Sequence, residues 1–372
     1  MARVARFFAI LSLGAALSCG CAANPAKPVA TDAAQVTAAL NEAVEADSEE
    51  AFSALFTGDT DIGIRHWIWL NMRMLAQVDF QAGDDGALVA DWRLEADSQP
   101  VSSHVGRIVC ASGGCALSDI GPQTGSRAPI WVVQPLQVLG DGDVTVLAGA
   151  QASDAQAWLA AAQTAQQAVA AADLGPVKEA WNGHLVVELP QDASAFAYAV
   201  GAPSAADYTT TGALTQVESP VGNGAASPVV RVVVNPQTTG SLTSAQRTLL
   251  LTHEAVHVAT AAVPVATGAT WVSEGLAENV AVAASPGDAA AEAAQAKAAC
   301  ADDGLEPPAD SAFGGTDAVA QNSAYAVSQV LIGLIRNHVG SDALQAVLLL
   351  WQGKTAPDVD LTAWSKAWCS AA

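Results

Sequence analysis

The sequence predicts an α+β fold in two parts. The first is a small domain with a helix and an antiparallel sheet, and the second is a larger domain with a strand layer and a mostly helical C-terminal half. Short strand-like runs fill residues 77–149, separated by Gly-Asp turns at residues 83–86 and 140–143. From residue 243 onward, helical patterns dominate instead. With 372 residues, of which 51% are hydrophobic, the chain can form sizeable cores.

The chain is strongly acidic, with 37 Asp and Glu against 15 Lys and Arg and a formal net charge of −22. Proteins that bind nucleic acids need a basic face to meet the phosphates, so this charge argues against a nucleic-acid partner. It also argues against electrostatic attachment to anionic lipids. Beyond these exclusions, the acidity bears on solubility more than on fold.

The N-terminal residues have the pattern of an export signal. Arg3 and Arg6 form a short positive segment, and residues 7–18 are uncharged and mostly apolar but too short for the ~20 residues that span a bilayer. The run ends in Leu-Ser-Cys-Gly-Cys, which resembles a bacterial lipobox, where a cysteine becomes the lipidated first residue of the mature chain. We expect residues 1–21 to be this signal peptide, with Cys21 preferred over Cys19 as the lipidated residue.

Residues 22–31 are rich in Ala, Pro, Lys and Asn, and we expect them to be a tether. The alternative is an ordinary secretory signal with incidental cysteines, and in both cases the chain is exported. No other uncharged apolar run reaches the length of a membrane-spanning helix. We therefore expect the protein at the extracellular face of the bacterial cell membrane through a lipid anchor, or secreted.

Four further cysteines can pair in three ways in an exported chain. Cys110 and Cys115 flank a plausible hairpin loop, where the spacing of opposed strand residues suits a disulfide. Cys300 and Cys369 would then pair with each other. A cysteine zinc site is the alternative, but the spacings do not match paired zinc knuckles and the expected compartment is oxidising.

The N-terminal domain is expected to comprise residues 32–150. Residues 33–55 have helical periodicity, and the strand-like runs follow. A helix followed by a curved antiparallel sheet is similar in outline to a small cystatin-like or nuclear transport factor-like cone, although no motif carries this likeness. The predicted strands lie at residues 78–80, 87–94, 105–110, 116–120, 130–138 and 144–147.

The second domain is expected to comprise residues 151–372. It begins with an Ala- and Gln-rich helix at 155–172, a strand at 184–189 and a short helix at 192–200. The β-branched run at residues 229–234 is the strongest predicted strand. The predicted helices beyond it lie at residues 243–262, 272–282, 289–299, 322–337 and 342–351.

The sequence His253-Glu254-Ala-Val-His257 is an H-E-x-x-H motif within a predicted helix. Thr243 and Gln246 form a capping box at the start of that helix. Because residues four apart share a helix face, both imidazoles can point at one metal ion, and two neutral imidazoles suit Zn²⁺. The alternative is a core helix with two incidental histidines, which would bury polar groups without partners at a cost.

The segment 271–278, Trp-Val-Ser-Glu-Gly-Leu-Ala-Glu, resembles the W-x-x-E-G-x-A signature of gluzincin zinc metallopeptidases of the peptidase MA-like group. A metzincin would need Gly and His where this chain has Thr260 and Val263. The resemblance covers residues 150–350 and implies a zincin-like fold. It also implies that His253, His257 and Glu274 bind Zn²⁺.

The same resemblance assigns further roles. Glu254 would be the general base, and Glu278 would hydrogen-bond a ligand imidazole and fix its orientation, unless it is simply a solvated helix residue. Gluzincins often stabilise the oxyanion with Tyr or His, and Tyr325 is our candidate, with His338 as a weaker one; core packing is the alternative for Tyr325. We therefore expect a zinc-dependent peptidase acting on peptide or protein substrates.

Two further expectations concern the substrate. In such peptidases an edge strand pairs with the extended substrate backbone, and residues 229–234 are the candidate, although a purely structural strand is equally consistent. No G-x-M-E-N-type exopeptidase signature precedes the motif helix, which lightly favours endopeptidase action. Alternative functions are a zincin-fold lipoprotein that binds without hydrolysis and a ligand-binding N-terminal domain.

Overall fold

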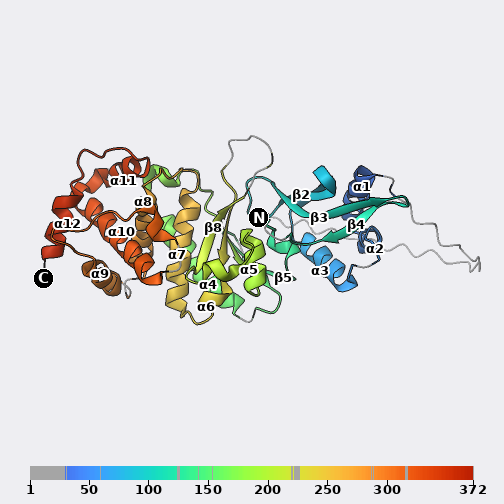
Figure 1. Ribbon diagram of the computed structural model, residues 1–372, viewed down its shortest axis with the longest axis horizontal. Coiled ribbons are helices and arrows are strands. Elements are labelled where there is room, and N and C mark those ends of the chain that lie inside the picture. Colours follow the sequence, from blue (N-terminus) through green and yellow to red (C-terminus); the bar gives the residue numbers. More distant parts are fainter. Residues whose placement is uncertain are drawn as a thin grey trace, which may run out of the picture.

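The computed structural model describes residues 30–371 except 31, 59, 124–125, 141, 153, 219–220, 222–226, 286, 288 and 315–316. It has the predicted α+β fold, with two sheets and a helical C-terminal half. Figure 1 shows the four-stranded sheet with helices α1–α3 at one end of the molecule, the C-terminal helices at the other, and the second sheet between them. The expected signal peptide and both lipobox cysteines lie outside the described residues.

The N-terminal sheet is an antiparallel meander of four strands in chain order. Its strands are β1 (Gln77–Ala82), β2 (Ala87–Arg93), β3 (Val101–Ala111) and β4 (Gly114–Ile120). Cys110 lies opposite Cys115 across β3 and β4, and the two form a disulfide, as predicted. Figure 1 also shows three helices at this end of the molecule, α1 (Ala33–Glu45), α2 (Glu49–Ala54) and α3 (Ile62–Met72).

The predicted helix at residues 33–55 is two helices, because Asp47 has a φ of 48° and interrupts the helical path. Ser48 then starts α2 by accepting a hydrogen bond from Ala51 N. Helix α3 has no counterpart among the predicted elements. It buries Ile68 and Trp69, so the tryptophans of this segment belong to a helix rather than to the face of a sheet.

The second sheet has the strand order β5-β6-β7-β9-β8. Its strands are β5 (Leu136–Leu139), β6 (Val144–Gly149), β7 (Leu185–Leu189), β8 (Ala213–Val217) and β9 (Val230–Val234). Strands β6, β7 and β9 are parallel, while β5 and β8 run antiparallel at the two edges. Helix α4 (Ala155–Ala171) lies between β6 and β7 in the chain, so the three form a βαβ unit.

Several elements in and near this sheet differ from the predictions. Strands β5 and β6 belong to the second sheet and not to the N-terminal domain. A domain boundary at residue 150 would therefore separate β6 from β7, the strand to which it is hydrogen-bonded. Strand β9 is not at the edge: every residue of it is buried, as expected of a strand paired on both sides. The edge strand is β8, which the sequence patterns did not predict, and residues 130–132 form a 3₁₀ turn rather than a strand.

Helices form the C-terminal half. They are α6 (Pro236–Thr239), α7 (Ser244–Thr260), α8 (Thr270–Ala284), α9 (Ala289–Ala298), α10 (Ala318–Val339), α11 (Ala343–Trp351) and α12 (Leu361–Ser370), and α5 (Ala193–Val200) precedes them. By length and composition alone, the run Ala318–Trp351 could cross a membrane, but half of its most apolar window is buried inside the fold. Its central residues, such as Leu331 and Ile335, instead pack in the core of this domain.

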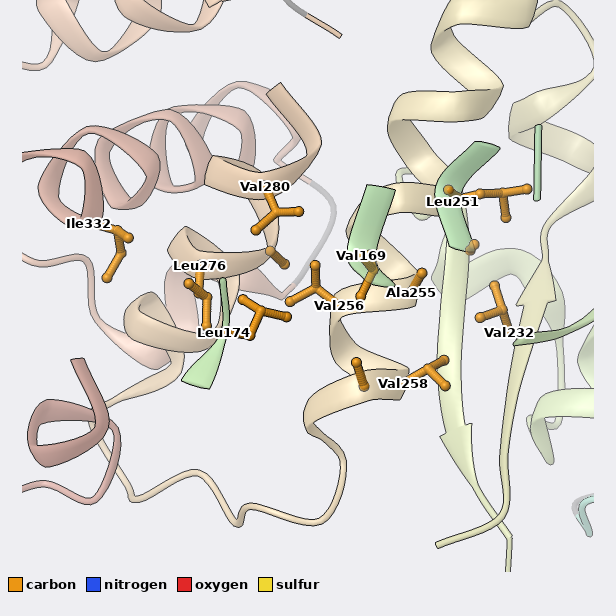
Figure 2. Packing of buried hydrophobic residues seen from close by; sticks show 14 of the residues in the cluster. Val169, Leu174, Val232, Leu251, Ala255, Val256, Val258, Leu276, Val280 and Ile332 are labelled. Atoms are coloured by element: carbon orange, nitrogen blue, oxygen red, sulfur yellow. The ribbon is translucent and has the colours of Figure 1, made fainter. Parts of the chain in front are cut away.

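Helix α7 is the central element of this half because it packs on both sides. Leu251 and Ala255 face Val232 of the sheet, whereas Val256 faces Leu276 of α8 (Figure 2). The predicted capping box is confirmed: Gln246 N donates to Thr243 Oγ1, and Thr243 N donates to Gln246 Oε1. A helix held by two packed faces and a capped first turn is a rigid support for side chains on its remaining face.

The loop between β2 and β3 contacts the second sheet through a buried charged cluster. The Arg231 guanidinium of β9 donates two hydrogen bonds to Asp97, of 2.7 Å and 2.6 Å, and both side chains are almost fully buried. Its Nε lies 3.9 Å from Glu188 Oε1 of β7, and neither of these two atoms has a hydrogen-bond partner among the described residues. Nearby, Arg127 donates to Glu218 at 2.6 Å. The cluster therefore combines three acidic residues, Asp97, Glu188 and Glu218, with the two arginines Arg127 and Arg231.

Glu188 makes the stability of the fold depend on pH. Burial raises its pKa from 4.5 to about 7, against the lowering effect of Arg127 and Arg231. A carboxyl whose pKa is raised by folding stabilises the folded state fully below pH 4.5, and this contribution is lost as the pH rises through 7. In the wild type, the free energy of unfolding should therefore fall by roughly 3 kcal/mol between pH 4.5 and pH 7 because of Glu188. We expect Glu188→Gln to remove this decline.

The measurement is the free energy of unfolding of both proteins from pH 5 to pH 8. Glu179→Gln, at an exposed glutamate, is the matched control and should follow the wild type. Parallel curves for wild type and Glu188→Gln would show that Glu188 does not titrate in this range.

The second predicted disulfide, Cys300–Cys369, is also confirmed, and it ties the end of α9 to α12. It closes a loop with a sequence separation of 69, against 5 for Cys110–Cys115. In the chain-entropy account, these loops correspond to about 4 and about 2 kcal/mol of stabilisation.

We expect the Cys300→Ala/Cys369→Ala double variant to unfold at clearly lower urea concentration than the Cys110→Ala/Cys115→Ala variant, because it loses the longer loop closure. The measurement is the midpoint of urea unfolding for each variant, and equal midpoints would contradict this ranking.

Candidate metal centre

Helices α7 and α8 bring three potential metal ligands together. His253 and His257 lie one turn apart on α7, and Glu274 lies on α8. Glu274 Oε2 is 3.1 Å from His253 Nε2 and 3.2 Å from His257 Nε2, and the two Nε2 atoms are 3.1 Å apart. Among the described residues, this is the group of His, Cys, Asp and Glu side chains that could hold a metal ion.

The tautomers of the two histidines explain why this arrangement suits a cation. Glu278 Oε2 lies 2.8 Å from His253 Nδ1, so the ring donates its Nδ1–H to this carboxylate. Ser273 Oγ lies in the corresponding place beside His257 Nδ1, at 3.5 Å. With its proton on Nδ1, a neutral His253 ring directs the lone pair of Nε2 toward His257 Nε2 and Glu274 Oε2, and the same holds for His257 when its Nδ1 carries the proton. Such a group repels itself unless a cation or protons lie between its members.

The donor set and spacing fit Zn²⁺. Tetrahedral zinc binds nitrogen and oxygen ligands at about 2.0–2.1 Å, which separates the ligand atoms by about 3.3 Å. The observed separations of 3.1–3.2 Å are close to that value. Two imidazoles and one carboxylate would supply three ligands to such an ion, and tetrahedral coordination has a fourth position for water or substrate.

The electrostatics favour positive charge at this place. Burial by itself lowers the pKa of His253, but its hydrogen bonds with Glu274 and Glu278 outweigh burial and raise that pKa well above its ordinary value. Burial opposes ionisation of Glu274, but the charge of His257 and the hydrogen bonds from both histidines hold its pKa far below the usual range. Carboxylates that attract a proton to His253 attract a metal cation in the same way.

Packing and capping fix where Glu274 lies. A Cβ added at Gly275 would lie 2.5 Å from the Ser328 carbonyl oxygen of α10, so glycine here permits the close approach of α8 to α10. At the start of α8, Asp310 accepts hydrogen bonds from Gly268 N at 2.7 Å and Thr270 N at 3.1 Å. Together these contacts set the position of α8 beside α7.

Glu254 lies beside the three ligands but is not one of them. It is buried, at 7% exposure, and its Oε2 accepts a hydrogen bond of 2.6 Å from Thr215 Oγ1 of strand β8. Among the described residues, no hydrogen bond is found to its other carboxylate oxygen. Glu254 therefore has one oxygen held by the sheet and one available at the site.

The centre opens into a cavity of about 820 Å³ between β8, α7, α8 and α10. Threonines and apolar side chains form much of its wall, and the charged groups that line it are Glu254, Glu274 and Glu278. The cavity is within the size range of ligand-binding sites. Its apolar wall includes Leu214, Val217, Leu242, Leu249, Leu250 and Val263.

Tyr325 also lines the cavity, with its ring edge-on to His253 at 5.7 Å and to Phe313 at 5.4 Å between ring centroids. Burial and the negative charges of Glu274, Glu254 and Glu278 raise the pKa of Tyr325 well above its ordinary value, so its hydroxyl keeps its proton. His338, the alternative candidate, stacks on Trp364 and does not line this cavity.

The structure thus brings together all the residues that the sequence singled out except His338. Sequence reasoning missed Thr215, Ser273 and Phe313. The alternating run of residues 213–217 next to the β9 strand was a weak signal for β8, but nothing local indicated that Thr215 would reach Glu254 across the fold.

No protein-family model and no curated protein matches this sequence.

We expect Glu278→Gln to weaken zinc binding at this centre by about 10- to 100-fold, because the amide is a weaker acceptor for His253 Nδ1–H than the carboxylate. Competition with a chromophoric chelator measures this affinity. Glu306→Gln, at an exposed glutamate outside the cluster, is the matched control. Unchanged affinity in Glu278→Gln would contradict the role given to Glu278.

Proposed function

We propose that this protein is a zinc-dependent peptidase. The observation that carries the proposal is the convergence of His253, His257 and Glu274 on one point, with the carboxylate of Glu254 beside it and a cavity in front of it. The order and spacing of these residues resemble those of gluzincin metallopeptidases. The site thus supplies three metal ligands, one open position and one unligated carboxylate, which is the set that metal-assisted hydrolysis needs.

Bound zinc would lower the pKa of a water molecule toward ~7 and polarise the peptide carbonyl. Glu254 accepts a proton from the attacking water and then delivers it to the leaving amine nitrogen, so the carboxylate ends the cycle unchanged. Tyr325 keeps its hydroxyl proton and donates a hydrogen bond to the carbonyl oxygen as negative charge develops there. Glu278 holds the orientation of His253 throughout.

Strand β8 is the element that best fits an extended substrate. It is the edge strand of the sheet, and residues 213–215 and 217 line the cavity. An unpaired strand edge can hydrogen-bond to the backbone of a peptide in extended conformation, while pockets accept its side chains. The apolar part of the cavity wall favours uncharged side chains near the scissile bond.

The two disulfides are compatible with an exported protein. With the N-terminal signal pattern, they support a proposal that the peptidase acts outside the cytoplasm, tethered by a lipid on Cys21, with Cys19 as the alternative, or in secreted form.

The test is hydrolysis of a peptide library by the purified protein with and without zinc. We expect zinc-dependent cleavage that a chelator abolishes and that Glu254→Gln reduces by at least about 10³-fold, because the general base is lost while the ligands stay. Zinc content, measured by atomic emission, should remain near one per chain in Glu254→Gln.

A protein that binds zinc but cleaves nothing would instead be a non-hydrolytic binding protein of the same fold. Normal turnover by Glu254→Gln would remove the general-base role from this residue.

A further inference from the structure

We infer that Thr215 is a positioning residue that holds the carboxylate of Glu254 for catalysis. The inference rests on the proposed peptidase function. It adds a residue of the edge strand β8, outside the two helices that carry the ligands, to the working parts of the site.

Strand geometry aims the Thr215 side chain at helix α7. Side chains alternate between the two faces of a strand, so Ala213 and Thr215 share one face and Leu214 takes the other. Ala213 is buried in the core that includes α7, while Leu214 packs in the separate cluster around Phe196 of α5. Pairing of Thr215 with Val232 of the interior strand β9 fixes its place along the sheet.

The hydrogen bond to Glu254 is short and involves a charged acceptor. Thr215 Oγ1 is 2.6 Å from Glu254 Oε2 and 3.3 Å from the Glu254 carbonyl oxygen. A hydroxyl has one proton, and the shorter contact to the carboxylate has the length expected of a charge-assisted bond. The proton stays on Thr215, and the bond holds Oε2 toward the sheet.

Holding one oxygen determines where the other lies. A glutamate has three side-chain torsions, and a general base works when its oxygen is within about 3 Å of the proton it removes. With Oε2 bonded to Thr215, rotation about the last torsion is restricted and Oε1 stays on the side of the cavity. Without the hydroxyl, a buried carboxylate oxygen loses its partner and turns to find another.

The same strand has a second role in the proposed function, because its outer edge is the place for the substrate backbone. One rigid segment thus sets both the position of the scissile bond and the position of the base. Placing both on one segment keeps the distance between base and substrate constant, which is the kind of preorganisation that accelerates a reaction.

The test compares Thr215→Val with Thr215→Ser. Valine keeps the branched shape and strand preference of threonine but lacks the hydroxyl, whereas serine keeps the hydroxyl. We expect Thr215→Val to lower kcat by about 10- to 100-fold with KM changed less than about 3-fold, at unchanged zinc content and melting temperature. Thr215→Ser should recover most of the wild-type kcat. Thr145→Val, the same substitution on strand β6, is the matched control and should leave kcat unchanged.

A double-mutant cycle adds a second readout. The shorter side chain of Glu254→Asp loses the contact with Thr215, so Thr215→Val should have no further effect in that background. Full additivity of the two changes, a wild-type kcat in Thr215→Val, or a loss that appears in KM alone would each overturn the positioning role. If the wild-type protein with zinc cleaves no peptide, the proposed function itself fails, which is a different outcome.

Discussion

The central constraint on the C-terminal half is that two imidazole nitrogens, of His253 and His257, and a carboxylate oxygen of Glu274 lie within 3.2 Å of one another. Packing of helices α7 and α8 against each other and against the sheet brings these atoms together. The helices of the C-terminal half keep these three side chains in position. Helix α7 carries both histidines on a face that its two packed sides leave free, and α8 carries Glu274 against it.

The position of α8 in turn depends on its contacts with residues much further along the chain, Ser328 of α10 and Asp310. Gly275 lets α8 approach the backbone of α10 closely, and Asp310 satisfies the first backbone N–H groups near its start. A larger residue at Gly275 would force the two helices apart. Because Gly275 is next to Glu274, that movement would also displace Glu274. Close packing of α8 against α10 therefore explains the glycine of this motif.

The N-terminal part of the chain is connected to the same framework through β9. Arg231 is paired with Asp97 on one side and, through backbone hydrogen bonds, with Gln216 of β8 on the other. The neighbour of Gln216 is Thr215, which holds Glu254. A continuous series of contacts therefore joins the buried charged cluster to Glu254.

The sequence by itself determined the local features: the capped helix with two histidines on one face, a second helix that carries Glu274, both disulfides and the α+β class. The helices and the Cys110–Cys115 hairpin follow from spacing along consecutive residues, because a helix period or a capping box is fixed by its own segment. The Cys300–Cys369 pair was inferred because these were the two cysteines that remained. Strand order was decided only by the tertiary structure, which placed β5 and β6 in the second sheet, β9 in its interior and β8 at its edge. A five-residue strand does not encode its partner, because its hydrogen bonds join segments far apart in the chain, and for the same reason the contact of Thr215 with Glu254 could be seen only in the folded protein.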